Sequence, residues 1–165
     1  SGPGSLFVHS DRPMISENAT STFIHELVHV AMRARSGPQA DWIVEGLAEY
    51  YSLEALHRSG TVSTARFEQA HRTLADWAAR EAGPLDAPRS AGATTARAVG
   101  VLRKVDAEIR AASGGRQSLD NVVADLAAQP KPVTLDMFRA SAERHAGRTL
   151  ASLQPAALKE PPATR

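Results

Sequence analysis

Two histidines and a glutamate lie at a spacing that suits metal chemistry. The run His25-Glu26-Leu27-Val28-His29 is an H-E-x-x-H sequence inside an apolar pattern of helical period. In a helix, His25 and His29 lie one above the other on the same face. Two imidazoles placed in this way can bind one ion at about 2.0–2.1 Å, the bond length that Zn²⁺ accepts. Glu26 lies one step around the helix, where a general base could reach a water held by that ion.

The simpler interpretation of this motif is an amphipathic helix whose two histidines face solvent or a neighbouring element. With six histidines in 165 residues, the motif arises by chance with a probability of roughly 1%. The motif is therefore informative, but it needs a third ligand to indicate a catalytic metal, because catalytic zinc takes three protein ligands and keeps one position open.

Glu45 is the candidate third ligand. It lies 16 residues beyond His29, on a helix that we expect to begin with an Asp41 cap and to end near residue 58. The short turn over residues 36–40 predicts that the two helices are antiparallel neighbours, with Glu45 facing both imidazoles. Glu49 follows one turn later on the same face and is a candidate acceptor for the ring N–H of a ligand histidine.

The alternative for the two glutamates is a solvated helix face, where acidic residues four apart are common. Against it, apolar residues flank both, and Gly46 costs about 1 kcal/mol relative to alanine inside a helix. A glycine is explained there if another backbone or a metal ligand approaches closely. Two inward carboxylates also require a compensating cation. The sequence therefore favours a three-ligand site.

The motifs HELVH and WIVEGLAEYY, which together span residues 25–51, resemble those of the gluzincin zinc peptidases. In that family H-E-x-x-H is followed by a W-x-x-E-G-x-A-E-Y block. The resemblance implies a Zn²⁺ site in which His25, His29 and Glu45 are the metal ligands, Glu26 is the catalytic base, and Glu49 is the acidic residue that orients a ligand.

A weaker resemblance to the glycyl aminopeptidase family continues through residues 98–125, 133–134 and 146–148. It implies a mostly α (α+β) fold with a thermolysin-like core, one short N-terminal edge strand at Leu6–His9 along which an extended substrate pairs, and a C-terminal helical bundle. We therefore expect one peptidase domain over residues 1–154, with zinc helices over 19–58, a helical block over 64–154, and a disordered tail over 155–165.

The sequence departs from this family in two places. Arg97 stands where relatives carry a tyrosine that hydrogen-bonds the oxyanion, so it is either a stabiliser of that charge or an ordinary surface residue. Tyr50, Tyr51 and His71 are other candidates, although the tyrosines fit packing roles better, and His9 is a candidate to line the cleft. Family members also carry more chain before the zinc helix, including groups that recognise a substrate α-amine, so aminopeptidase activity is not predicted.

The composition excludes several classes of protein and several types of metal ligand. The 19 Lys and Arg residues nearly balance 18 Asp and Glu, which argues against a nucleic-acid-binding protein. No apolar run is long enough to span a membrane, and the absence of cysteine leaves histidine and carboxylate as metal ligands.

The predicted function is zinc-dependent hydrolysis of peptide bonds in a peptide or protein substrate. The alternatives are a catalytically inactive zinc-binding scaffold or interaction module, and a helical domain without metal. We expect a mature fragment of a bacterial envelope or secreted protein, whose residues 1–5 are either an expression remnant or a Gly-rich lead-in.

Overall fold

The computed structural model describes residues 13–159, of which 66% are helical. The elements in chain order are α1 (Thr22–Met32), α2 (Asp41–Arg58), α3 (Thr64–Glu81), α4 (Ala93–Ser113), α5 (Leu119–Ala127), α6 (Leu135–Ala146), the 3-10 turn η1 (Ala151–Leu153) and α7 (Pro155–Lys159). This range contains no strand, only an isolated parallel bridge between Ser36 and Val133. The predicted edge strand Leu6–His9, and His9 with it, lie outside the described residues.

Side-chain caps mark several helix ends, although the predicted Asp41 cap is not one of them, because α2 begins at Asp41 after an Ala40 cap without a side-chain bond. Ser63 and Thr134 accept backbone N–H bonds at the starts of α3 and α6, and Gly147 ends α6 in the left-handed region. The first helix is shorter than predicted: its cap is Ser21, whose Oγ accepts from the backbone N of residue 24 at 3.3 Å. It ends where Arg33 turns left-handed, with φ 51°.

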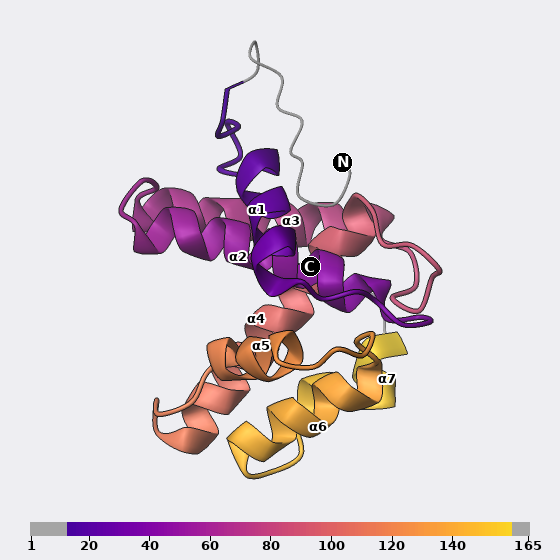
Figure 1. Ribbon diagram of the computed structural model, residues 1–165. Helices are drawn as coiled ribbons and strands as arrows, with labels where there is room; N and C mark the ends of the chain where they lie inside the picture. The colour runs from indigo at the N-terminus through magenta and orange to yellow at the C-terminus, as the bar shows by residue number, and fades with distance from the viewer. Residues whose placement is uncertain (1–12, 160–165) are drawn as a thin grey trace.

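Helix α4 is the central element of the fold (Figure 1), because it contacts α2, α3, α5, α6 and η1. Helices α2 and α3 lie along one side of it, and α5 and α6 lie along the other. Helices α1 and α2 are neighbours, as predicted, but the prediction that they are antiparallel is wrong. Figure 1 shows α1 running across α2, and the linker between them is held by Val133, which donates its N–H to the Arg35 carbonyl and accepts from Gly37 N at 2.8 Å.

Gly46 marks the closest approach of α2 to α4. A Cβ atom at this position would lie 2.7 Å from Cβ of Ala98 and 3.0 Å from Cδ1 of Leu102. Only a glycine permits the two helices to pack at this distance. The mid-helix glycine is therefore explained by a neighbouring helix, one of the two explanations that the sequence predicts.

We expect Gly46→Ala to lower the free energy of unfolding by about 1–2 kcal/mol, because overpacking against α4 outweighs the gain in helix propensity. Gly100→Ala on α4 is the matched control, since a Cβ there has no atom within 4 Å, and it should stabilise by roughly 0.5–1 kcal/mol. Urea unfolding of both variants measures the difference. Equal effects would contradict the close α2–α4 crossing.

The C-terminal segment differs from the predicted disordered tail. Residues 155–159 form α7, Leu158 packs partly against the core, and its carbonyl accepts a hydrogen bond from Arg97 Nη2 at 2.8 Å. The prediction is therefore wrong for these five residues. Residues 160–165 lie outside the described range.

His71 belongs to the core between α3 and its neighbours. Its side chain is 6% exposed and packs edge-on against Phe67, with ring centroids 4.6 Å apart. Nε2 of His71 has no hydrogen-bond partner among the described residues. Burial, together with the positive charge of Arg103, lowers the pKa of His71 from 6.5 to about 4.

This depressed pKa gives His71 a defined effect on stability. The unfolded chain takes up a proton at this histidine below about pH 6.5, whereas the folded chain keeps it neutral down to about pH 4. Stability therefore falls as pH drops through this window, by up to about 3 kcal/mol from this group. We expect His71→Leu to remove this part of the pH dependence, as measured by urea unfolding at pH 7 and pH 4.5. If the stability of the variant and the wild type fell in parallel, the assignment would be wrong.

Candidate metal centre

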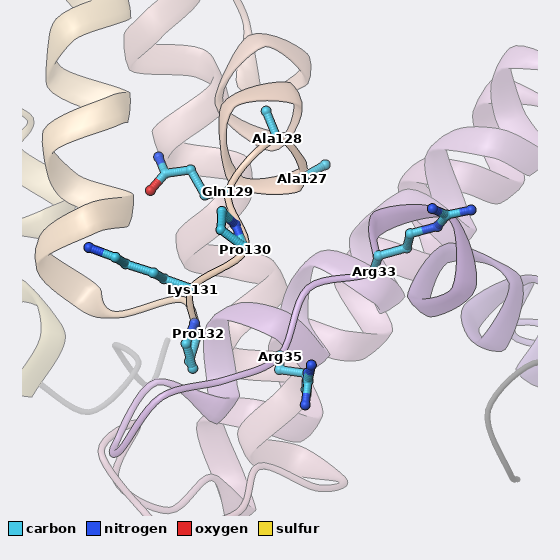
Figure 2. Close-up of a pocket in the computed structure, with 8 residues that line it drawn as sticks. All are labelled: Arg33, Arg35, Ala127, Ala128, Gln129, Pro130, Lys131 and Pro132. Atoms are coloured by element: carbon cyan, nitrogen blue, oxygen red, sulfur yellow. The ribbon is translucent and has the colours of Figure 1, made fainter.

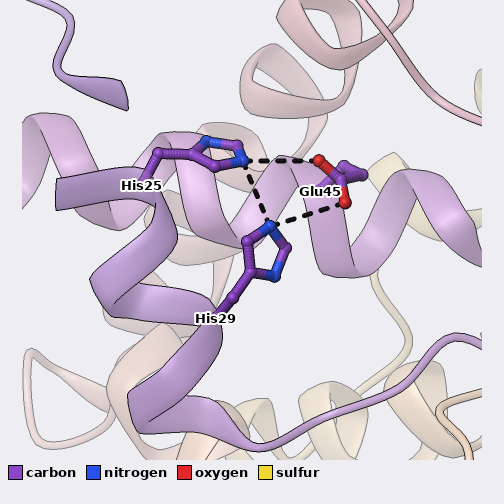
Figure 3. Close-up of side chains that lie close together, drawn as sticks. All are labelled: His25, His29 and Glu45. Carbon is purple, nitrogen blue, oxygen red and sulfur yellow. Dashed lines mark hydrogen bonds and ion pairs between the residues drawn. The ribbon is translucent and has the colours of Figure 1, made fainter. Parts of the chain in front are cut away.

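The crossing of α1 over α2 brings together the three predicted metal ligands (Figure 3). Nε2 of His25 and Nε2 of His29 lie 3.1 Å apart. Each nitrogen lies 3.4 Å from one carboxylate oxygen of Glu45. Among the described residues, these three form the group of His, Asp and Glu side chains that could hold a metal ion.

These separations are compatible with a zinc site. Ligand atoms at about 2.0–2.1 Å from an ion in tetrahedral geometry lie about 3.3 Å from one another. The two nitrogens lie 3.1 Å apart, and each lies 3.4 Å from a different oxygen of Glu45. With one ligand atom taken from each residue, the three atoms lie within 4.8 Å of one another, so a carboxylate oxygen must move toward both nitrogens to complete the site. Two imidazoles and one carboxylate are also a common donor set of catalytic zinc.

Glu49 contacts the far side of the His25 ring, as the sequence predicts. Nδ1 of His25 donates to Oε2 of Glu49 at 3.0 Å. When a metal replaces the second ring proton, the neutral imidazole would keep its proton on Nδ1 and direct the lone pair of Nε2 toward the ion between Glu45 and His29. This arrangement fixes both the tautomer and the orientation that a metal-binding histidine needs.

The charges in the site are strongly coupled. Burial opposes a charge on His25, but hydrogen bonds and attraction from Glu45 and Glu49 outweigh it and raise the pKa of His25 to about 9. Hydrogen bonds from His25 and His29 in turn lower the pKa of Glu45 to about 2. The cluster therefore favours a positive charge between the carboxylates, which is also the property that a cation site requires.

A buried contact outside the cluster fixes the start of α1. The hydroxyl of Ser52, on α2, donates to the Ser21 carbonyl at 3.2 Å, and the side chain of Ser52 is fully buried. The same carbonyl accepts the backbone N–H of His25 at 2.9 Å. Ser52 lies one turn beyond Glu49 on α2. The bond from Ser52 to the Ser21 carbonyl and the bond between Glu49 and His25 therefore join α1 to adjacent turns of α2, and together they fix the position of His25 relative to α2.

Two of the three candidate ligands, His25 and Glu45, line a pocket of about 370 Å³, whereas His29 does not. Glu26 lines this pocket with His25, Glu45 and Glu49, which is where a base acting on a bound water must lie. The rest of the lining comes from the first turn of α1, from α3 and from the segment that leads into α4: Thr20, Thr22, Leu74, Trp77, Ser90, Ala91, Gly92, Thr95 and Ala96.

The structure does not bring Arg97 to this pocket. Its Nη1 donates to the Gly83 carbonyl at 3.2 Å and its Nη2 to Leu158, and it lines a separate cavity. The prediction of Arg97 as an oxyanion stabiliser is therefore wrong, and Arg97 has a structural role between α4 and α7.

Tyr50 and Tyr51 have packing roles, as expected. Tyr50 is buried, and the Tyr51 hydroxyl donates to Asp120 at 2.8 Å.

Another cavity, of about 500 Å³, lies where α1 and α5 end (Figure 2). Its cationic residues are Arg33, Arg35 and Lys131. Figure 2 shows that these three side chains point in different directions. They do not converge on one point, as the recognition of a single anion would require.

Sequence reasoning did not identify the pocket wall that faces α3 and α4. Trp77 is half-buried and lines the pocket, whereas a tryptophan at helical spacing is more often a core residue. Asp41 supports this wall through Oδ2, which accepts the Ser90 N–H at 2.7 Å. Helical spacing of Leu74 and Trp77 was the only available signal, and it does not distinguish a core from a pocket.

None of the described helices is long and apolar enough to cross a membrane. Comparison with known proteins gave no match to a protein-family model, to a curated protein or to a solved structure. The resemblance to the gluzincins stays a prediction that rests on the motifs of residues 25–51.

Proposed function

We propose that this chain is a zinc-dependent peptidase that hydrolyses peptide bonds with the help of a glutamate base. The observation that carries the proposal is the convergence of Nε2 of His25, Nε2 of His29 and the carboxylate of Glu45 on one point, where they could hold a metal ion. When bound, zinc supplies Lewis-acid activation of a water and of a carbonyl. The residues of this chain provide binding, orientation and proton transfer.

Each residue has a defined task in this proposal. His25, His29 and Glu45 bind the ion, and Glu49 orients His25 through its Nδ1–H. Glu26 accepts the proton of the attacking water and passes it to the leaving amine. The solvated-face alternative for Glu45 and Glu49 does not fit the structure, because both carboxylates contact His25.

An inactive zinc-binding scaffold is the second candidate, and one observation favours it. Among the described residues that line the pocket, none is a tyrosine, an arginine or a lysine. An oxyanion would therefore have to be stabilised by hydroxyls, such as those of Thr20, Thr22 and Thr95, or by the metal. The two candidates differ in catalysis and agree on metal binding.

We expect Glu26→Gln to keep one zinc per chain and to lose peptide cleavage by roughly 10²–10⁴-fold, because only the proton acceptor is removed. Glu45→Ala should lose both peptide cleavage and bound zinc, because it removes a metal ligand. Metal content after dialysis, measured by mass spectrometry, and cleavage of a fluorescent peptide library test both variants. Glu54→Gln, also on α2 but outside the pocket, is the control and should retain both properties.

The outcomes separate the candidates. If the Glu26→Gln variant cleaved peptides at the wild-type rate, Glu26 would not be the base. A wild-type chain that holds one zinc and cleaves no peptide would be the inactive scaffold. A chain that takes up no zinc at all would contradict both and leave a helical domain without metal.

A further inference from the structure

We propose that a cavity outside the metal centre binds a small organic acid, in which one carboxylate is attached to an apolar group. The cavity has a volume of about 480 Å³. It lies among the start of α2, the loop between α3 and α4, α4 itself, the start of α6, and α7. None of its lining residues lines the metal pocket. The proposal therefore concerns a separate site, and it goes beyond the proposed function.

Two arginines hold the walls of this cavity together. Arg139, on α6, donates from Nε and Nη2 to the Leu153 carbonyl at 3.3 and 3.1 Å. Arg97, on α4, donates from Nη2 to the Leu158 carbonyl at 2.8 Å. The chain from η1 to α7 is thus fastened to two helices, and the cavity exists before a ligand arrives. A preformed site lowers the entropic cost of binding.

The indole of Trp42 supplies a hydrogen-bond donor to this cavity. Trp42, on α2, is 2% exposed and packs edge-on against Phe138, with ring centroids 6.3 Å apart. Its Nε1–H donates to none of the described residues, and this nitrogen is not fully enclosed. A buried indole N–H usually has an acceptor. Since the ring lines the cavity, a ligand oxygen placed there would accept this bond.

The charges around the cavity favour an anion. Its cationic lining residues are Arg97, Arg139 and Lys159, and its acidic ones are Asp86 and Asp136. Three cations and two anions give the described lining a net charge of +1. Both acids are exposed, and the pair of Asp136, 93% exposed, with Arg139 contributes little. A carboxylate in the cavity would gain charge-assisted hydrogen bonds from Arg139 or Lys159, which are roughly twice as strong as neutral ones.

The rest of the lining favours an apolar group on the same ligand. Leu85 is buried, and Leu135 and Leu158 pack partly against the core. These leucines line the cavity together with Pro84 and Pro155. An apolar group placed against them would be stabilised in proportion to the apolar area that it removes from water. The volume of the cavity also lies in the range of about 300–1,000 Å³ that is typical of small-molecule sites.

Calorimetry with three related probes tests the class of ligand. The probes are phenylbutyrate, its uncharged amide phenylbutanamide, and butyrate, which lacks the ring. We expect phenylbutyrate to bind at least about 10-fold more tightly than the amide, which loses the charge-assisted bonds, and about 10-fold more tightly than butyrate, which buries less apolar area. The affinity should be the same with and without added zinc, because none of the candidate metal ligands lines this cavity.

The fluorescence of Trp42 locates the bound probe. Trp77→Phe leaves Trp42 as the remaining tryptophan of the chain, and Trp77 lines the metal pocket rather than this cavity. Titration with phenylbutyrate should quench or shift the emission of Trp42 with the same dissociation constant that calorimetry gives. Binding without a change in this emission would place the probe elsewhere and overturn the proposal.

A charge reversal at one lining residue tests the recognition of the carboxylate. Lys159→Glu replaces an exposed side chain, so folding is preserved, and it should weaken binding of phenylbutyrate about 10-fold while changing that of phenylbutanamide by less than about twofold. Lys104→Glu is the matched control, because Lys104 is exposed on α4 and lies outside this cavity. Equal weakening by the two substitutions would contradict a carboxylate bound in the cavity.

A peptide probe distinguishes two sources of the same chemistry. Acetyl-leucyl-phenylalanine and its C-terminal amide are compared in the zinc-free chain, so that metal-dependent hydrolysis does not interfere. Tighter binding of this peptide acid than of phenylbutyrate would assign the site to peptide C-termini, and the reverse order would assign it to free organic acids. Both orders support the proposal. The absence of saturable binding of either acid, or equal binding of the acids and their amides, would overturn it.

Discussion

The arrangement of α1 and α2 depends on the contacts of His25, on α1, with the carboxylates of Glu45 and Glu49, on α2. Both carboxylates leave α2 toward α1 and are partly buried. Two neighbouring carboxylates in such a position are unfavourable unless a positive charge compensates them. The imidazole of His25 meets this need by holding a proton, which its pKa of about 9 expresses. A divalent cation at the same nitrogens would meet the need with more charge.

Helix α2 connects the site to the rest of the fold, because one of its faces makes polar contacts with α1 and the other packs closely against α4. One face carries the glutamates toward α1, and the other carries Gly46 against Ala98 of α4. Because α4 also brings Ala96 to the pocket, the close crossing at Gly46 sets the distance between the metal ligands and the opposite wall. A substitution in the core thus changes the width of the site without touching a ligand.

The sequence predicted the parts of the structure that depend on local spacing. His25 and His29 share a face because of helical periodicity, and Glu45 was identifiable because it follows on the next helix. The crossing angle of α1 was not predictable, because a bridge to Val133 sets it from far along the chain. Arg97 was assigned to the site because it stands where relatives carry a tyrosine, and this correspondence does not fix the direction of its side chain. In the structure the adjacent Ala96 lines the pocket, and Arg97, about 100° further around the helix, bonds to the Leu158 carbonyl.

Helix α1 is held by the apolar contacts of Ile24, Val28 and Met32 together with polar contacts at the site, and the polar contacts link its position to what the site binds. Its outer face leaves Leu27 38% and Val30 48% exposed, so apolar burial holds only its inner face. The bonds from His25 to Glu49 and from Ser52 to the Ser21 carbonyl supply the rest. Any ligand that bridges α1 and α2 binds only when α1 is docked, and it therefore stabilises the docked state in proportion to its affinity. Metal affinity and the order of the first helix are, on this argument, two measures of the same equilibrium.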